Sequence, residues 1–194
     1  MNISKFENQY FSFELEFDVS DKLVNFSINK QTPEFLEVIT IMKSFIGLYI
    51  HDFKVALSNQ EKLRYSRHLN LPDFGIPTQQ KLKRAKVLVV GTGGLGAPLL
   101  QYLTAVGVGT IGVVDFDVID ESNLQRQVLF GMEDIGKFKT EVAITKLRAQ
   151  NPFVHFIEYN LKLDASNALE IISNYDVVAD GTDNFPTRYL VNDA

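Results

Sequence analysis

The segment Gly91-Thr92-Gly93-Gly94-Leu95-Gly96 constrains the fold of this chain more than any other feature. It follows a short apolar run at residues 87–90 and precedes a helix-like stretch at 97–106. Glycines let the backbone approach a phosphate closely, and the start of a helix supplies unpaired N–H groups and a positive dipole end. This context predicts a nucleotide in a Rossmann-like crevice, with a tight turn that binds no ligand as the alternative.

Stretches typical of strands and helices alternate after residue 86. We expect strands at 87–90, 111–114, 154–159 and 177–179, and helices at 97–106, 139–150, 165–173 and from about 186 onward. Short, wholly apolar strands are typical of a parallel sheet that is buried on both faces. The repetition predicts a doubly wound, Rossmann-like, mostly parallel α/β sheet. Because the chain ends just inside the last predicted helix, we expect an incomplete sheet and a fragment.

Residues 1–57 show a different pattern of apolar and polar residues, and we expect a small α+β segment of unknown role there. Alternating apolar and polar residues predict a hairpin with strands at 11–17 and 23–28, followed by a helix capped by Thr32. The second domain, 58–194, begins with a capping box formed by Ser58 and Glu61, which predicts one helix to about residue 69. Residues 71–77 are rich in turn formers and are interpreted as a connection.

Composition excludes several classes of protein. The 194 residues contain no cysteine, so a disulfide framework, a thiolate zinc site and a cysteine nucleophile are impossible within them. A net charge of −5 does not favour nucleic acid or an anionic membrane as partner. The N-terminus lacks the apolar core of a signal peptide, and the longest apolar stretch is too short and interrupted to span a bilayer. We therefore expect a cytoplasmic protein that binds a protein or a small molecule.

Charged residues at successive strand ends indicate the chemistry. Asp115 ends the second predicted parallel strand, where a carboxylate can accept hydrogen bonds from ribose, and this alone also fits an NAD-dependent oxidoreductase. Arg126, Lys139 and Asp183 follow. Taken singly, each cation is explained as a solvated surface charge. Together they favour nucleotidyl transfer, which needs cations and a carboxylate-bound Mg²⁺ around an attacked α-phosphate.

Five segments, in this order, resemble one family of adenylyltransferases, the HesA/MoeB/ThiF type. They are RYSRH (64–68), VVGTGGLG (89–96), DFD (115–117), SNLQRQ (122–127) and TDNFPTR (182–188). Members of this family are related to ubiquitin-activating enzymes, and they activate ubiquitin-like sulfur carriers for molybdopterin or thiazole synthesis. The resemblance covers about residues 58–194 and implies the N-terminal half of an ATP-binding adenylation domain.

The resemblance also implies roles for individual residues. Nucleotide-binding residues would be Gly91, Gly93, Gly94, Gly96, Asp115, Asp117, Asn123, Arg126, Gln127, Lys139, Asp183 and Asn184. Asp115 would hold the ribose, Asn123, Arg126 and Lys139 the phosphates, and Asp183 the Mg²⁺. Arg67 matches an arginine that reaches the ATP of the neighbouring subunit in a homodimer, with a charge on the helix surface as the alternative. The implied catalytic residues are Arg126, Lys139, Asp183 and Arg67.

The implied reaction is ATP-dependent adenylation of the C-terminal glycine carboxylate of a ubiquitin-like sulfur carrier, with release of pyrophosphate. The paired CxxC zinc site and later cysteine of many relatives cannot exist in these residues. Two alternatives stay open. An NAD-dependent Rossmann oxidoreductase would bind NAD and tolerate loss of Arg126, and an inactive truncated fragment or scaffold would keep the fold without turnover. The residues favour neither the molybdopterin nor the thiazole pathway.

Overall fold

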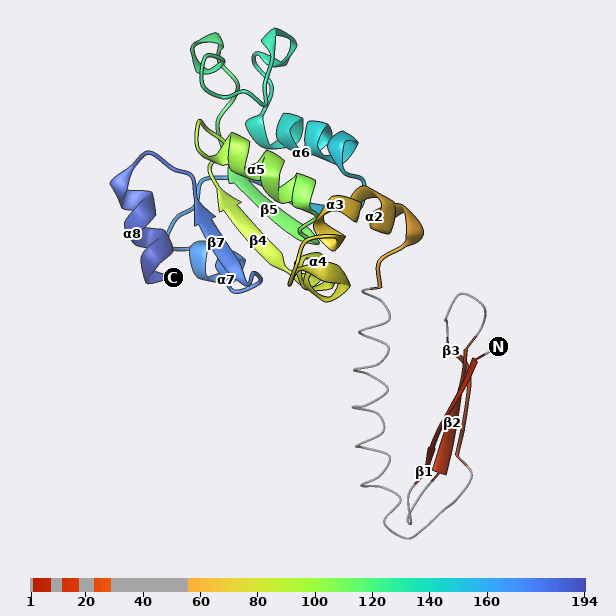
Figure 1. Cartoon of the computed structure of the whole chain (residues 1–194). Coiled ribbons are helices and arrows are strands. Elements are labelled where there is room, and N and C mark those ends of the chain that lie inside the picture. The colour runs from red at the N-terminus through yellow and green to blue at the C-terminus, as the bar shows by residue number, and fades with distance from the viewer. Residues whose placement is uncertain (1, 8–11, 18–22, 29–55) are drawn as a thin grey trace. The chain divides into compact units, whose positions relative to one another are not determined.

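The computed structural model describes residues 2–7, 12–17, 23–28 and 56–194 (Figure 1). The chain divides into two compact units, residues 1–56 and 57–194. The first contains an antiparallel sheet in the order β1 (Asn2–Glu7), β2 (Ser12–Phe17), β3 (Leu23–Ile28). The strands expected at 11–17 and 23–28 correspond to β2 and β3, whereas the helix expected after Thr32 lies outside the described residues. Strand β1 was not expected, because its apolar residues, Ile3 and Phe6, do not alternate with polar ones.

The second unit is built on a four-stranded parallel sheet in the order β6-β5-β4-β7. Its strands are β4 (Lys86–Val90), β5 (Thr110–Asp115), β6 (His155–Asn160) and β7 (Val177–Asp180). The chain adds β5 and β6 on one side of β4 and then returns to add β7 on the other. This reversal is the topological switch point of a doubly wound fold, so the predicted Rossmann-like α/β sheet is confirmed.

Helices cover both faces of this sheet, which explains the apolar strands. Helices α5 (Gly96–Val106) and α6 (Lys139–Gln150) pack on one face, where Val89 and Val113 contribute to the core (Figure 1). On the other face, Leu88 and Val114 belong to a second cluster. Residues of α7 (Ala168–Ile172) and α8 (Phe185–Asp193) complete that cluster. Successive residues of one strand thus enter different cores.

Three helices precede the parallel sheet: α2 (Asn59–Arg64), α3 (Ser66–Leu69) and α4 (Gly75–Arg84). The predicted capping box is present, since Ser58 Oγ accepts from the Glu61 amide and the Glu61 carboxylate accepts from the Ser58 amide. The single helix expected to residue 69 is interrupted at Tyr65, whose buried hydroxyl accepts from Asn151 Nδ2 at 2.9 Å. The expected connection at 71–77 is partly wrong, because α4 begins at Gly75.

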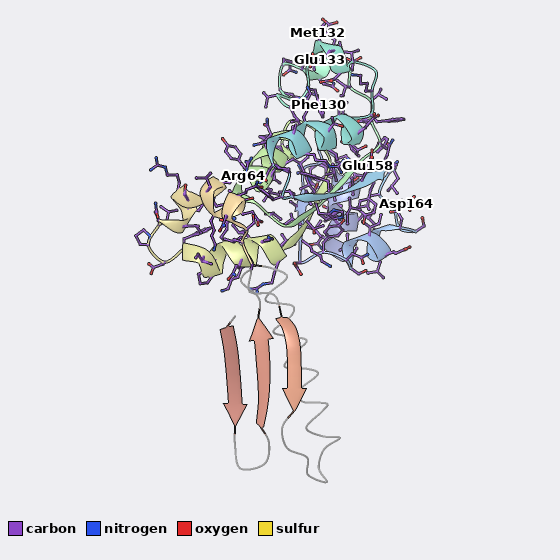
Figure 2. All side chains as sticks on the ribbon, turned by 90° about the vertical axis from the view of Figure 1, so that its right-hand side faces the viewer. Arg64, Phe130, Met132, Glu133, Glu158 and Asp164 are labelled. Carbon is purple, nitrogen blue, oxygen red and sulfur yellow. The ribbon has the colours of Figure 1, made fainter. Side chains whose placement is uncertain are left out.

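The connection from β5 to α6 is long and folded back on itself. It contains the 3₁₀ turns η1 (Glu121–Asn123) and η2 (Met132–Asp134), and Val118 bridges Phe138 in antiparallel fashion. Figure 2 shows Met132 and Glu133 at the tip of this connection. Burial opposes ionisation of Asp134, but its contacts with Lys146 and the Gly131 amide hold the pKa of its carboxyl below the usual value.

The predicted helix at 165–173 is shorter in the structure. Asp164 Oδ1 accepts from the Ser166 amide at 2.8 Å, and this turn delays α7 until Ala168. None of the helices in the described parts of the chain has the length and apolar character that a bilayer-spanning helix requires.

Candidate functional site

A cleft of about 720 Å³ lies at the carboxyl ends of the parallel strands. Its lining comes from the loops that follow β4, β5, β6 and β7, and from Lys139 at the start of α6. The strand ends are level, since Val90 pairs with Val114 on one side and with Asp180 on the other. Ligands of open α/β sheets bind at this edge, and the volume suits a small molecule.

All of the predicted site residues except Gly96 and Arg67 line this cleft. The structure thus brings together Arg126, Lys139 and Asp183, which lie far apart in the sequence. Gly96 instead packs inside the loop, where an added Cβ would lie 1.8 Å from the Gly91 carbonyl oxygen. Arg67 is exposed on α3.

The glycine loop is held tightly between three strand ends. Gly91 has a left-handed φ of +88° and its amide donates to the Val114 carbonyl at 2.7 Å. An added Cβ on Gly91 would lie 3.2 Å from the backbone of Gly181, so β7 closes the loop from the other side. Helix α5 then begins without a side-chain cap. Glycines 93 and 94 line the cleft beside this helix start, the arrangement that a phosphate site requires.

Asp115 joins the glycine loop to the end of β5. Its Oδ2 accepts from both the amide and the hydroxyl of Thr92, each at 2.7 Å. Its Oδ1 accepts from the amide of Asp117 at 2.9 Å. Asp115 is buried, and Thr92 is fully buried. The carboxylate therefore organises the loop, in addition to facing the cleft.

Lys139 is a buried cation with a carboxylate partner. Its side chain is 6% exposed, and Nζ lies 2.9 Å from Asp117 Oδ2. The Lys139 amide also donates to the Asp117 carbonyl at 3.0 Å. Asp117 therefore fixes both the backbone and the ammonium group of Lys139 at the cleft wall.

The turn that follows η1 presents Arg126 and Gln127 beside the glycine loop. Both of their amides donate to the Asn123 carbonyl, at 3.1 and 3.0 Å. The exposed Arg126 runs past Gly94, so that its Cδ lies 3.5 Å from where a Cβ on that glycine would be. Gln127 is buried, yet its Oε1 has no hydrogen-bond partner within the described residues. An unsatisfied buried polar atom in a cleft wall indicates a position that a ligand or water completes.

The loop after β7 holds Asp183 in the cleft. Asp180 Oδ1 accepts from the Thr182 amide at 2.8 Å, and Arg188 Nη2 donates to the Thr182 carbonyl at 2.9 Å. Asn184 caps α8 by accepting from the Thr187 amide at 3.0 Å. Asp183 is exposed, and its carboxylate has no hydrogen bond to any other described residue. It is therefore available to a ligand.

The lining carries both signs of charge. Lys162, in the loop after β6, adds a cation that sequence reasoning missed. Hydrogen bonds from the Ser122 side chain and amide lower the pKa of Asp120, another lining carboxyl. No group of three or more metal-binding side chains occurs in the part of the chain that the structure describes. The exposed carboxylate of Asp183, which has no partner among the described residues, suits the usual mode of Mg²⁺ binding, in which one or two carboxylates act together with phosphates and water.

Comparison with known proteins gives consistent matches. The sequence model of the ThiF family matches residues 65–194. The probable adenylyltransferase/sulfurtransferase MoeZ of Mycobacterium tuberculosis is 58% identical over 139 residues, which cover 72% of this chain and 36% of MoeZ. The sulfur carrier protein adenylyltransferase of Thermus thermophilus is 54% identical over 137 residues, covering 71% of this chain and 51% of the relative. This chain therefore spans about a third to a half of these relatives.

Solved structures agree with the sequence matches. A crystal structure of E. coli tRNA N6-threonylcarbamoyladenosine dehydratase, TcdA, in complex with ATP superposes with a TM-score of 0.62 at 26% identity. The match covers 66% of this chain and 52% of that one. A crystal structure of E. coli MccB with succinimide gives a TM-score of 0.56 at 35% identity, covering 62% of this chain and 38% of that one.

Proposed function

This chain belongs to the ThiF family, and on that basis we propose that it carries an ATP site for adenylating a ubiquitin-like sulfur carrier protein. The carrier's C-terminal carboxylate would form an acyl-adenylate, with release of pyrophosphate. The Thermus thermophilus relative is named a sulfur carrier protein adenylyltransferase, which supports both the reaction and the partner. The observation that carries the proposal is the convergence of Arg126, Lys139 and Asp183 on one cleft beside the glycine loop. The comparisons do not favour an NAD-dependent oxidoreductase.

The reaction needs charge neutralisation more than proton transfer. A C-terminal carboxyl has a pKa of about 3.5 in model peptides. At neutral pH it is therefore already an anion and needs no general base. One carboxylate oxygen attacks the α-phosphorus, and the bond to the β-phosphate breaks as pyrophosphate leaves. We assign Arg126 and Lys139 to the negative charge on the phosphates. Asp183 would hold Mg²⁺, which neutralises the departing pyrophosphate.

The cleft also suggests how ATP lies. Phosphates on the glycine loop and ribose at Asp115 direct the base toward the loop after β6. The cleft lining includes Phe116, Leu161 and Leu163, whose apolar surfaces suit a planar base, and we propose that the base lies against them, near Lys162.

Arg67 needs a second copy of the chain to take part. It lies on α3 and does not line the cleft of its own subunit. We propose that it reaches the ATP site of a partner in a homodimer, as the family resemblance implies.

ATP–pyrophosphate exchange with a candidate carrier tests the proposal directly. We expect carrier-dependent exchange that falls about 100-fold or more in Arg126→Ala and Asp183→Asn. Arg148→Ala is the matched control, because Arg148 is an exposed cation on α6 outside the cleft. Binding of NAD without exchange, or full exchange in Arg126→Ala, would refute the proposed function.

Mixing two inactive variants tests the role of Arg67 in the partner's site. A dimer of Arg67→Ala with Lys139→Ala contains one site in which both residues are intact. Random pairing of equal amounts should therefore restore about a quarter of wild-type exchange. No recovery, in a sample that contains mixed dimers, would exclude action across the dimer.

A further inference from the structure

The hydrogen-bonding capacity of Asp115 is almost fully used within the protein. A carboxylate offers about four acceptor positions, two on each oxygen. The amide and hydroxyl of Thr92 occupy both positions on Oδ2, and the amide of Asp117 occupies one on Oδ1. One position remains, and it is on Oδ1.

Of the two hydrogen bonds that Thr92 donates to Asp115, only the one from the hydroxyl depends on the threonine side chain. Thr92 is fully buried and does not line the cleft, so its hydroxyl has no solvent to turn to. The Oγ1–Oδ2 distance of 2.7 Å is typical of an O–H···O hydrogen bond. An alanine at position 92 would keep the amide bond to Asp115 but remove one of the two hydrogen bonds that hold Oδ2 in the buried interior, so that the carboxylate can turn Oδ2 toward the cleft.

We infer that Thr92 determines the ribose selectivity of the nucleotide site by restricting Asp115 to one ribose hydroxyl. This inference rests on the proposed ATP site. ATP presents a 2′ and a 3′ hydroxyl, and the single open position on Oδ1 accepts from one of them. Thr92 acts through Asp115 and is a positioning residue. The site therefore distinguishes strongly between ATP and one deoxy analogue, and weakly between ATP and the other.

Binding of ATP, 2′-deoxyATP and 3′-deoxyATP to the full chain, measured by calorimetry, tests this. In the wild-type protein one analogue should bind about tenfold more weakly than ATP, and the other within about twofold of ATP. In Thr92→Ala the ratio between the two analogues should fall at least threefold. Thr92→Ser retains the hydroxyl and should keep the wild-type ratio.

The outcomes separate this inference from the proposed function. Equal affinities of the two analogues for the wild-type protein would overturn the role of a single acceptor, even though ATP binds. An unchanged ratio in Thr92→Ala would overturn the role of Thr92. Failure of ATP itself to bind would overturn the proposed site and this inference with it. The wild-type comparison stands even if Thr92→Ala fails to fold.

Discussion

Replacing Gly96 with alanine places a methyl group inside the glycine loop. The new Cβ would lie 1.8 Å from the Gly91 carbonyl oxygen and 2.8 Å from its carbon. Both are backbone atoms, so no side-chain rotation relieves the contact. Real Cβ contacts essentially never fall below 3.0 Å, so the loop must move by more than about an ångström. Gly91 cannot yield easily, because its amide is bonded to β5 and Gly181 packs behind it.

The loss of stability in Gly96→Ala follows from the rigidity of the backbone around it, at Gly91 and Gly181. Overpacking of side chains costs about 1–3 kcal/mol, and a backbone clash belongs at or above the upper end of that range. A loss of about 3 kcal/mol should lower the midpoint of thermal unfolding by roughly 10 °C in a unit of this size. A shift of about 1 Å at the loop should also reduce ATP–pyrophosphate exchange about 100-fold. Thermal unfolding and exchange are measured on the same preparation.

Gly94→Ala is the matched control in the same loop. Its Cβ would lie 3.5 Å from the Arg126 side chain, an ordinary contact, so the unfolding midpoint should change by less than about 2 °C. Gly94 lines the cleft, however, and an added methyl group there competes with a bound phosphate. ATP affinity should fall at least about tenfold. Wild-type stability in Gly96→Ala would refute the packing argument, and undiminished ATP affinity in Gly94→Ala would refute the phosphate position.

Three further predictions, which use four substitutions, test other parts of the unit. Gly107→Ala should lower the free energy of unfolding, measured by chemical denaturation, by about 3 kcal/mol, because its Cβ would lie 2.4 Å from a buried tyrosine hydroxyl. Gly136 has a similar left-handed φ but open space around it, so Gly136→Ala should lower the free energy by only about 1 kcal/mol. Equal losses in the two variants would contradict this reasoning. Burial opposes ionisation of Glu61, but its contacts with Lys83 and the helix cap outweigh burial and hold the pKa of this carboxyl below its usual value. The stabilisation that the ionised Glu61 contributes is therefore complete above pH about 4.5 and is lost as pH falls through the lowered pKa. Urea unfolding at pH 7 and pH 3 should show a smaller loss in Glu61→Gln than in wild type. Arg188→Met should reduce exchange about tenfold with little change in unfolding midpoint, and unchanged exchange would show that the loop after β7 does not need this arginine.

Most residues that line the cleft could be predicted from the sequence. The strands and the glycine loop have local sequence signals, and the topology of a parallel sheet brings the ends of its strands to one edge. The strand–turn–helix at 87–106 follows from apolar runs and glycines that are adjacent in the chain. Parallel strands end at one edge, so Asp115 and Asp183 come together once the sheet is predicted. The predicted helix at 139–150 coincides with α6, which delivers Lys139 to the cleft.

The features that were missed lack such local signals. Pro77 suggested a turn, yet a proline fits the first turn of a helix, where its missing N–H would have no partner. Lys162 is one lysine in a loop, and by type alone it is indistinguishable from a solvated charge. The role of Arg67 stays a prediction, because Arg67 does not line the cleft of its own subunit and would act only in a second copy of the chain.

Residue type also conceals whether a polar group is still free to bind a ligand. Asp115, Asp117 and Asp183 are of one residue type, and each ends or follows a strand of one sheet. In the structure Asp115 retains one acceptor position, and Asp117 is paired with Lys139. Asp183 has no hydrogen bond to any other described residue. Of the three carboxylates, Asp183 in the loop after β7 is therefore the one most available to a cation that enters the cleft. A phosphate must compete with Asp117 for Lys139, whereas the exposed Arg126 needs no such exchange.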